Sequence, residues 1–263
     1  MKKSIKGLIA SFVMGALVIT GCGAKEQTAP NASSGQQEFH FAMSGMYKPF
    51  NYKENNELKG FDVEIGVALA EKMGMKPVPV TNPWETIIPG LQSKKYDAIL
   101  GSMTVTEERK KVVAFTNPYY RSGSQIFVSE NNNDIHSPED LKGKRIGVCK
   151  ATPYKDLALQ YTSKENVVEY ESDLVALMDL PSGRIDAVIT DQMVGFPIIK
   201  AGAIKIKDVG EPMSHDDQAI AVRKDDKELM DKLNKALDEI IKDGTYAKIS
   251  EKYFGRSILG DKN

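Results

Sequence analysis

Short apolar runs alternate along the chain with segments in which apolar residues recur at helical spacing. The run at 39–43 is typical of a buried strand. A helix is expected next, because apolar side chains recur every four residues at Phe61, Ile65, Leu69 and Met73. The same succession of strand and helix begins again at 145–149. Strands and helices that alternate at these lengths predict an α/β fold, with mostly parallel sheets covered by helices on both faces.

A ten-residue pattern occurs twice, at 91–100 and at 180–189. Each copy reads as the end of a helix, a turn, and an apolar strand that begins after Asp-Ala. The repeat predicts two related lobes, each with roughly the length of a small α/β unit. Ligands of open α/β sheets bind outside the carboxyl ends of the strands. We therefore expect a ligand cleft between the lobes, to which each lobe contributes different polar groups.

Two further apolar stretches, 124–128 and 218–222, match neither copy of the repeat. We interpret them as strands that cross between the lobes, after which an amphipathic helix at 229–241 returns the chain to the first lobe. The predicted architecture is two Rossmann-like lobes with central mixed sheets, joined by a two-strand hinge that suits closure around a ligand. The expected boundaries are 38–125 and 219–258 for lobe 1, and 126–218 for lobe 2.

The first residues are typical of a targeting segment. Basic residues precede an apolar run at 8–20, which is too short to span a bilayer comfortably. The run ends in Ile-Thr-Gly-Cys22, which resembles the lipobox of bacterial lipoproteins. That resemblance implies a signal peptide at 1–21 and a lipid anchor on Cys22; the alternative is an ordinary signal peptide with a chance cysteine. The polar segment 22–37 predicts a flexible tether, so the expected location is extracytoplasmic, at the cell membrane.

The charge balance is close to neutral, with 35 Lys and Arg against 36 Asp and Glu. This balance does not favour nucleic-acid binding. His40, His136 and His215 are scattered, and no spacing among them suggests a metal site. A lipid on Cys22 would leave Cys149 as the only other cysteine, so no disulfide is expected. We expect no metal and no cofactor.

Arg109 is a candidate anion-binding residue. It falls in the first turn of a short helix that Thr106 is expected to cap, at the electropositive end of the helix dipole. One interpretation is a solvated basic helix face, because two lysines follow it. The other is that the guanidinium points into the cleft and binds a carboxylate bidentately, helped by N–H groups at the helix start.

Asp191 is a second candidate, because it ends the second repeat strand where Ser102 ends the first. It is interpreted either as a cap for the next helix or as a carboxylate that pairs with an ammonium group. An arginine on one lobe and an aspartate on the other would complement a zwitterion, which points to a free amino acid. Trp84 and Tyr47 also follow strands, and each is either a core residue or an apolar wall for a ligand.

An ordered set of short motifs runs through the chain. The motifs are Tyr47–Tyr52 (YKPFNY), Gly60–Glu64 (GFDVE), Trp84 with Ile88–Leu91 (IPGL), Tyr96–Ala98 (YDA), Thr104–Arg109 (TVTEER), Phe115–Tyr120 (FTNPYY), Leu141–Lys144 (LKGK), Asp243–Thr245 (DGT) and Tyr253–Phe254 (YF). In this order the set resembles the polar amino acid solute-binding proteins of bacterial ABC importers, over about residues 38–256. The resemblance implies a periplasmic-binding-protein type II fold, in which two lobes close on a free amino acid.

The resemblance also implies which residues bind the ligand. Arg109 would hold the α-carboxylate with the backbone N–H groups of Thr104 and Thr152, and Asp191 would bind the α-ammonium. Ser44 stands where binders of basic amino acids often carry an acid, which argues against lysine or arginine. Tyr154, Met46 and Met103 would make a soft pocket, so a neutral polar or sulfur-containing amino acid is expected. The implied ligand-binding residues are Ser44, Tyr47, Trp84, Gly101, Ser102, Thr104, Arg109, Thr152 and Asp191.

The segment 149–154 departs from the usual family pattern. Many relatives carry glycine where this chain has Ala151, and a polar residue where it has Pro153. Alanine has less backbone freedom than glycine. Contacts of this loop with a ligand are therefore implied less directly by the resemblance than those of Arg109.

The implied partners are a free amino acid and a permease in the cytoplasmic membrane, with the chain acting as a monomer and not as an enzyme. Two alternatives use the same fold. The first is a dehydratase of prephenate or arogenate, in which Asp191 would act as a general acid. The second is the ligand-sensing subunit of a signalling receptor. The order of residues along the chain suggests no catalytic Cys–His or Ser–His pair. The lipobox-like segment favours a tethered binding protein over an enzyme.

Overall fold

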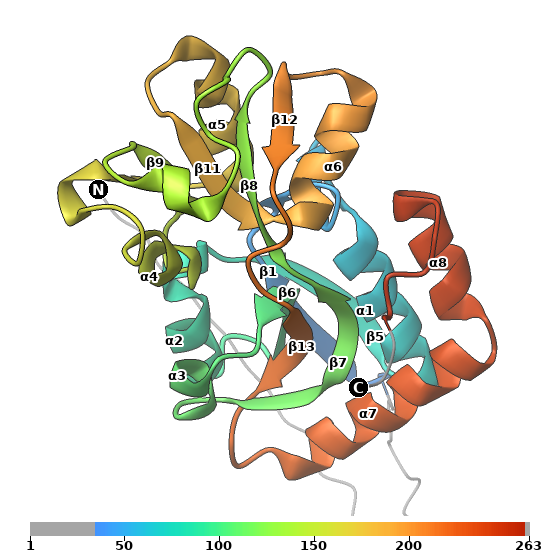
Figure 1. Ribbon diagram of the computed structural model, residues 1–263. Coiled ribbons are helices and arrows are strands. Elements are labelled where there is room, and N and C mark those ends of the chain that lie inside the picture. The colour runs from blue at the N-terminus through green and yellow to red at the C-terminus, as the bar shows by residue number, and fades with distance from the viewer. Residues whose placement is uncertain (1–34, 261–263) are drawn as a thin grey trace, which may run out of the picture. The chain divides into compact units, whose positions relative to one another are not determined.

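The computed structural model describes residues 35–260. The predicted signal peptide, Cys22 and most of the predicted tether lie outside these residues. The β structure consists of two five-stranded sheets and one three-stranded sheet (Figure 1). Both large sheets belong to the unit that begins at Gln36. No helix within the described residues is both long and apolar enough to cross a membrane.

The first sheet has the strand order β5-β1-β6-β13-β7. β1 is parallel to β5 and β6, whereas β13 is antiparallel to β6 and β7. β6 carries the strand of the first repeat copy, and it is central and buried along its whole length. The strands are β1 (Glu38–Met43), β5 (Lys76–Thr81), β6 (Ala98–Thr104), β7 (Ala114–Ser122) and β13 (Asp216–Val222).

The second sheet has the order β10-β9-β11-β8-β12, and its central strand β11 carries the second repeat copy. β9 is parallel to β10 and β11, whereas β8 is antiparallel to β11 and β12. The predicted α/β class with two mixed sheets is confirmed, although antiparallel pairs are as frequent as parallel ones, because each crossing strand enters antiparallel. The strands are β8 (Ser124–Ser129), β9 (Ile146–Cys149), β10 (Val167–Tyr170), β11 (Ala187–Asp191) and β12 (Ile206–Val209).

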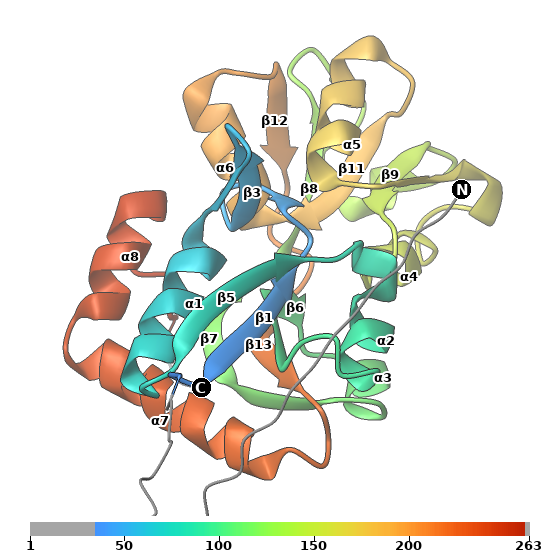
Figure 2. The same cartoon turned by 180° about the vertical axis from the view of Figure 1, so that it is seen from behind.

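Helices pack against both sheets, and α1 and α7 lie where the apolar spacing predicted helices (Figures 1 and 2). α7 shows the reason most clearly: Asp226 caps its first turn, and the side chains it buries, Leu233 and Leu237 among them, recur at helical spacing. The helices on the side of the first sheet are α1 (Phe61–Lys72), α2 (Ile87–Gln92), α3 (Glu107–Lys110), α7 (Lys227–Lys242) and α8 (Thr245–Phe254), of which α8 packs on α1 and α7. Those on the second sheet are α4 (Tyr154–Ala158), α5 (Asp173–Asp179) and α6 (Gln192–Ala201). The 3-10 turns are η1 (Trp84–Thr86), η2 (Pro138–Leu141), η3 (Lys164–Asn166) and η4 (Leu180–Ser182).

The segment after β1 forms the three-stranded sheet. Its last two strands are joined by Asn55 and Asn56, which both have positive φ angles, 52° and 65°. Positive φ at both central residues is the geometry of a tight hairpin turn, and asparagine tolerates it well. The strands are β2 (Met46–Tyr47), β3 (Asn51–Glu54) and β4 (Glu57–Lys59).

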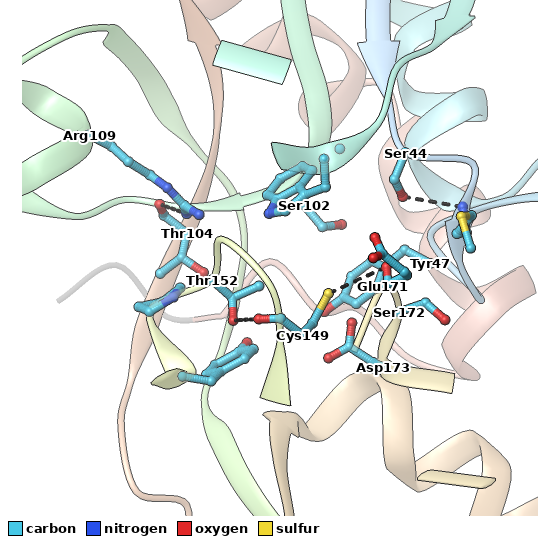
Figure 3. Close-up of a pocket in the computed structure, with 15 residues that line it drawn as sticks. Ser44, Tyr47, Ser102, Thr104, Arg109, Cys149, Thr152, Glu171, Ser172 and Asp173 are labelled. Carbon is cyan, nitrogen blue, oxygen red and sulfur yellow. Dashed lines mark hydrogen bonds between the residues drawn. The ribbon is translucent and has the colours of Figure 1, made fainter. Parts of the chain in front are cut away.

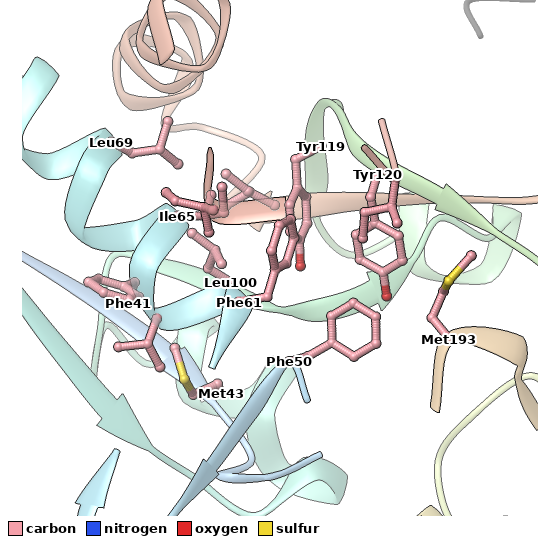
Figure 4. Packing of buried hydrophobic residues seen from close by; sticks show 14 of the residues in the cluster. Phe41, Met43, Phe50, Phe61, Ile65, Leu69, Leu100, Tyr119, Tyr120 and Met193 are labelled. Carbon is pink, nitrogen blue, oxygen red and sulfur yellow. The ribbon is translucent and has the colours of Figure 1, made fainter. Parts of the chain in front are cut away.

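Aromatic rings fill the core between the first sheet and α1 (Figure 4). Phe50 stacks on Tyr120 with ring centroids 4.9 Å apart, and Phe61 stacks on Tyr119 at 6.0 Å. Pairs of this kind stabilise a fold by about 0.5–1.5 kcal/mol beyond the area that they bury. Met193, at the start of α6, belongs to the same cluster and lies beside Phe50 and Tyr120. The core therefore continues from the first sheet to the second.

Two chain crossings connect the sheets. β7 leads into β8 through Gly123, and β12 leads into β13 through 210–215. The crossings are bonded to each other: Ser124 N donates to Ser214 Oγ at 3.0 Å, and Met213 N donates to the carbonyl of Ser124 at 2.8 Å. Because these bonds tie one crossing to the other, the two form a single paired connection.

Gly123→Ala is expected to destabilise the protein by at least about 3 kcal/mol. A Cβ at this position would lie 2.1 Å from the carbonyl oxygen of Ser214. That oxygen belongs to the backbone of the other crossing, so the strands would have to separate. The free energy of unfolding in urea measures the effect. Gly183→Ala is the control: its φ is 71° but a Cβ there meets no atom within 4 Å, so it should cost only about 1 kcal/mol. An equal loss in both variants would contradict the prediction.

Candidate functional site

A pocket lies where strands of both sheets end (Figure 3). Its walls include the last residues of β6 and β9 and the segments that follow β1 and β10. It holds about 500 Å³ of empty space, part of it open to solvent. This is the position at which the repeat predicted a ligand cleft.

The structure brings eight of the nine predicted ligand-binding residues to this pocket, and Asp191 is the exception. The eight are Ser44, Tyr47, Trp84, Gly101, Ser102, Thr104, Arg109 and Thr152. Seven further residues line the pocket but were not among those predicted to bind the ligand. They are Met46, Cys149, Pro153, Tyr154, Glu171, Ser172 and Asp173.

The guanidinium of Arg109 enters the pocket without a charged partner. Its Nη1 donates to the carbonyl of Thr104 at 2.8 Å, and its Nη2 donates to the carbonyl of Ala151 at 3.0 Å. Burial lowers the pKa of Arg109 to about 10, so the group is still a cation at neutral pH. The arginine ion pairs within residues 35–260 are formed by other arginines. A cation in a partly closed pocket, bonded only to neutral carbonyls, favours an anionic ligand.

The carbonyl of Ala151 accepts a second bond, from Trp84 Nε1 at 3.2 Å. Ala151 lies between β9 and α4 and has a φ of 56°, a left-handed conformation that glycine adopts more easily. Alanine at this position, where many relatives carry glycine, therefore still adopts the left-handed turn. The turn directs one carbonyl toward two side chains of the first-sheet side, Trp84 and Arg109.

Ser102 is positioned by a buried carboxylate. Its Oγ donates to Asp62 at 3.0 Å, and Asp62 also accepts from Tyr119 at 2.7 Å and from Asn51 at 2.7 Å. Asp62 is fully buried, and this burial raises its pKa to about 6 although the three donors lower it. The aspartate of the GFDVE motif thus holds the end of β6 against α1.

Asp173 is the carboxylate that the second sheet contributes to the pocket. It is 3% exposed, it begins α5, and its Oδ1 accepts from Thr190 Oγ1 at 2.5 Å. Burial is the largest cause that raises its pKa. Figure 3 places it with Ser172 and Cys149 on the side of the pocket opposite Ser102. Sequence reasoning missed Asp173, because an acid after Ser172 reads as an ordinary helix start.

Asp191, the ninth residue predicted to bind the ligand, lies close behind the pocket wall, where burial and the charge of Asp191 raise the pKa of the pocket-lining Tyr47 and Tyr154. Asp191 is 1% exposed and does not line the pocket. Its Oδ1 accepts from Met193 N at 2.7 Å, which caps α6, and from Ser122 Oγ at 2.5 Å. The physical reason is that α6 begins directly after β11, so the carboxylate turns back to the free N–H groups of the helix. The structure thus shows the helix cap, and the binding of an ammonium group by Asp191 stays a prediction.

Asp191→Asn is expected to make stability less dependent on pH. Burial raises the pKa of Asp191 from 3.8 to about 7. A carboxyl group whose pKa is higher in the folded state than in the unfolded state stabilises the protein most below the unfolded-state pKa. This stabilisation is lost as the pH rises from about 4 to about 7. Asparagine keeps an oxygen for Ser122 and Met193 but cannot ionise. Between pH 5 and pH 8 the melting temperature of the wild type should therefore fall further than that of the variant. Asp62, whose pKa is also raised by burial, lowers the stability of wild type and variant alike as the pH rises. If the melting temperatures of both proteins fell by the same amount between pH 5 and pH 8, the assignment to Asp191 would be wrong.

Cys149 and Thr152 complete the wall from the second sheet. Cys149 is buried, and its thiol lies 3.8 Å from the carbonyl of Glu171. Burial raises the pKa of this thiol, which keeps it neutral. The Thr152 hydroxyl donates to the carbonyl of Cys149 at 2.6 Å. This wall therefore presents a soft, uncharged surface next to Asp173.

The chain is similar to known proteins over most of its length. The family of bacterial extracellular solute-binding proteins, family 3, matches residues 39–256. The chain is 38% identical to a probable amino-acid-binding protein, YxeM, of Bacillus subtilis over 98% of this chain and 97% of that protein. It is 33% identical to the L-cystine-binding protein TcyJ of Escherichia coli over 82% of each.

A solved structure of an ancestral arginine-binding protein bound to glutamine is 39% identical, with a TM-score of 0.78, and covers 84% of this chain and 99% of that one. The fold is thus the type II fold of periplasmic amino-acid-binding proteins. With a family match over most of its length and relatives of this identity, the chain belongs to the bacterial extracellular solute-binding proteins of family 3.

Proposed function

We propose that this protein is the extracytoplasmic substrate-binding component of an ABC amino-acid importer. It captures a free neutral polar or sulfur-containing amino acid in the pocket and delivers it to a permease. The observation that carries the proposal is a pair of opposite charges facing one pocket: the Arg109 guanidinium from the first-sheet side and the buried Asp173 carboxylate from the second. This pair complements the two charges of an amino-acid zwitterion.

Arg109 holds the α-carboxylate in this proposal. Its guanidinium already points into the pocket, where its two nitrogens are bonded to neutral carbonyls. A carboxylate can replace or share those bonds and form a charge-assisted pair, which is stronger than a bond between neutral groups. The backbone N–H groups of Thr104 and Thr152 are the proposed additional donors.

Asp173 binds the α-ammonium in this proposal, the role that the sequence suggested for Asp191. One of its oxygens is bonded to Thr190, and no lysine or arginine of the described part of the chain forms an ion pair with it. A buried carboxylate without a cation is costly unless a ligand supplies one. Pairing with an ammonium therefore stabilises both the ligand and the pocket.

The side chain of the ligand lies among Trp84, Tyr47, Met46 and Cys149. Thioether, thiol and aromatic groups suit a polarisable or weakly polar side chain. Ser44 donates to Asn51 Oδ1 at 3.0 Å and carries no charge. The absence of an acid at this position argues against lysine and arginine as ligands.

Capture proceeds by closure. The bonds from Trp84 and Arg109 to the Ala151 carbonyl tie the two sides of the pocket together. A ligand that contacts both sides stabilises this closed form, and exclusion of water strengthens its charge pairs. The proposal includes a monomeric chain, a lipid anchor on Cys22 and docking of the closed form on the permease.

A thermal-shift screen tests the proposal. The sample is the chain without residues 1–22, freed of bound ligand by unfolding and refolding, and the panel holds common amino acids, cystine, prephenate and arogenate. A ligand at a thousand times its Kd stabilises by about 4 kcal/mol, which raises the melting temperature by roughly 8–16 °C. A shift with an amino acid supports the proposal. Turnover of prephenate or arogenate would indicate a dehydratase instead, and no response to any compound would overturn amino-acid capture.

A further inference from the structure

A second cavity adjoins the ligand pocket. The two share Ser44, Met46, Trp84 and Glu171 as lining residues. The second cavity holds about 860 Å³ of empty space, part of it open to solvent. Its other walls come from the end of β5, the start of η1 and the residue after β9. A ligand side chain that passes between Met46 and Trp84 would enter this cavity directly.

The second cavity carries charges of both signs. Lys150 Nζ lies 2.5 Å from Glu171 Oε1 and 3.8 Å from Glu85 Oε1. Glu85 belongs to η1 on the first-sheet side, whereas Lys150 and Glu171 follow strands of the second sheet. All three side chains remain partly exposed, from 35% for Lys150 to 64% for Glu171. They can therefore exchange their present partners for a ligand without first being desolvated.

We infer that this cavity receives the far end of the ligand, and that this end is a second amino-acid head with both an ammonium and a carboxylate group. The inference rests on the proposed function, because the first head must occupy the pocket of Arg109 and Asp173. The ligand class is then a diamino dicarboxylic acid whose two heads are joined by an apolar linker. A disulfide or thioether linker suits the passage, because Met46 and Trp84 present a polarisable surface on either side of it.

The mixed charges decide between this class and its rivals. A ligand that ends in a cation alone would pair with the two glutamates but leave Lys150 without a partner, and one that ends in an anion alone would pair with Lys150 but face both Glu85 and Glu171. A ligand that ends in an apolar group would displace water from three charged side chains without replacing its hydrogen bonds. A zwitterionic head satisfies all three, with its carboxylate on Lys150 and its ammonium between the two glutamates.

Isothermal titration calorimetry with matched ligands tests the inference. L-Cystine and L-cystathionine carry two heads; L-methionine and S-methyl-L-cysteine carry one head and a similar linker. The wild type should bind a two-headed ligand at least 10-fold more tightly than either one-headed ligand. Lys150→Met should remove most of that preference while the affinity for one-headed ligands stays within twofold.

Lys155→Met is the matched control. Lys155 also forms a lysine–glutamate pair, 2.6 Å from Glu169, with a similar exposed fraction of 36%, but it lines neither cavity. It should leave the affinity for both ligand types unchanged. One-headed ligands that bind as tightly as two-headed ones, tighter binding of L-arginine, or an equal loss for both ligand types in Lys150→Met would overturn the inference and leave the proposed function standing. Failure of every amino acid to bind would instead overturn the proposed function.

Discussion

Replacing Arg109 with alanine is expected to weaken amino-acid binding at least about 30-fold, because truncating one partner of a desolvated charge pair costs about 2–5 kcal/mol or more. The guanidinium is the charged group that the first-sheet side brings to the pocket for a carboxylate. The fold should survive, since Arg109 bonds only to two backbone carbonyls, and that of Ala151 keeps its bond from Trp84. Calorimetric titration gives the affinity, and circular dichroism with thermal melting gives the stability.

Lys110→Ala is the control for this prediction. Lys110 is the next residue of the same short helix, but it is exposed and paired with Glu107 at 2.7 Å. Its removal should change the affinity by less than twofold, because exposed pairs contribute little. If Arg109→Ala bound the ligand with nearly normal affinity, the carboxylate would have to be held elsewhere and the assignment would be wrong.

Asp173→Asn is expected to reduce the affinity for amino acids with a free α-amino group at least about 30-fold, since the ammonium loses its buried anion. Asparagine keeps an oxygen for the bond from Thr190, so the start of α5 should persist. An analogue of the ligand that lacks the α-amino group should bind wild type and variant alike. Titrations of both compounds against both proteins at one pH measure the effect.

Asp191→Asn distinguishes the two buried aspartates. Its side chain can still cap α6 and accept from Ser122. Because Asp191 lies outside the pocket lining, ligand affinity should change by less than threefold. The reverse result, with Asp191→Asn losing ligand and Asp173→Asn retaining it, would restore the first assignment of the ammonium site.

The repeat shows how far sequence reasoning reaches in this chain. It correctly predicted that β6 and β11 are equivalent strands, the third in the order of each sheet, and it pointed to Ser102 at the pocket. It could not predict the bonds of Asp191, because the equivalence of the two strands does not extend to the segments after them: α6 begins at once after β11, whereas a short extended segment separates β6 from α3. The side chain at a strand end then bonds to the nearest unpaired N–H groups.

Asp173 carried a weak signal that could have found it. It follows β10, which pairs in register with β9 from Val167 with Ile146 to Tyr170 with Cys149. The ends of these two strands therefore meet at the same edge, and the first aspartate after β10 comes close to the loop of Thr152. The hairpin of β3 and β4 was missed for a different reason. The pair Asn55-Asn56 is a turn signal, but the flanking strands are too short and too polar to show a clear alternation.

The order in which strands follow one another also bears on how the chain assembles. The five strands of the second sheet come from one continuous stretch, 124–209, so that sheet can complete itself from neighbouring sequence. The first sheet cannot. β7 joins it only through β13, and β13 does not begin until Asp216. Contacts between distant parts of a chain form slowly, because the entropy of closing the intervening loop must be overcome first.

When the chain forms from its N-terminus onward, the second lobe can therefore fold before β13 is present. At that stage β7 has no neighbouring strand in the first sheet. Until β13 is present, the hydrogen-bonding edges of β6 and β7 are unpaired, and unpaired edges of this kind invite aggregation. The last 48 residues, which begin with β13 at Asp216, thus decide when the first lobe closes its sheet.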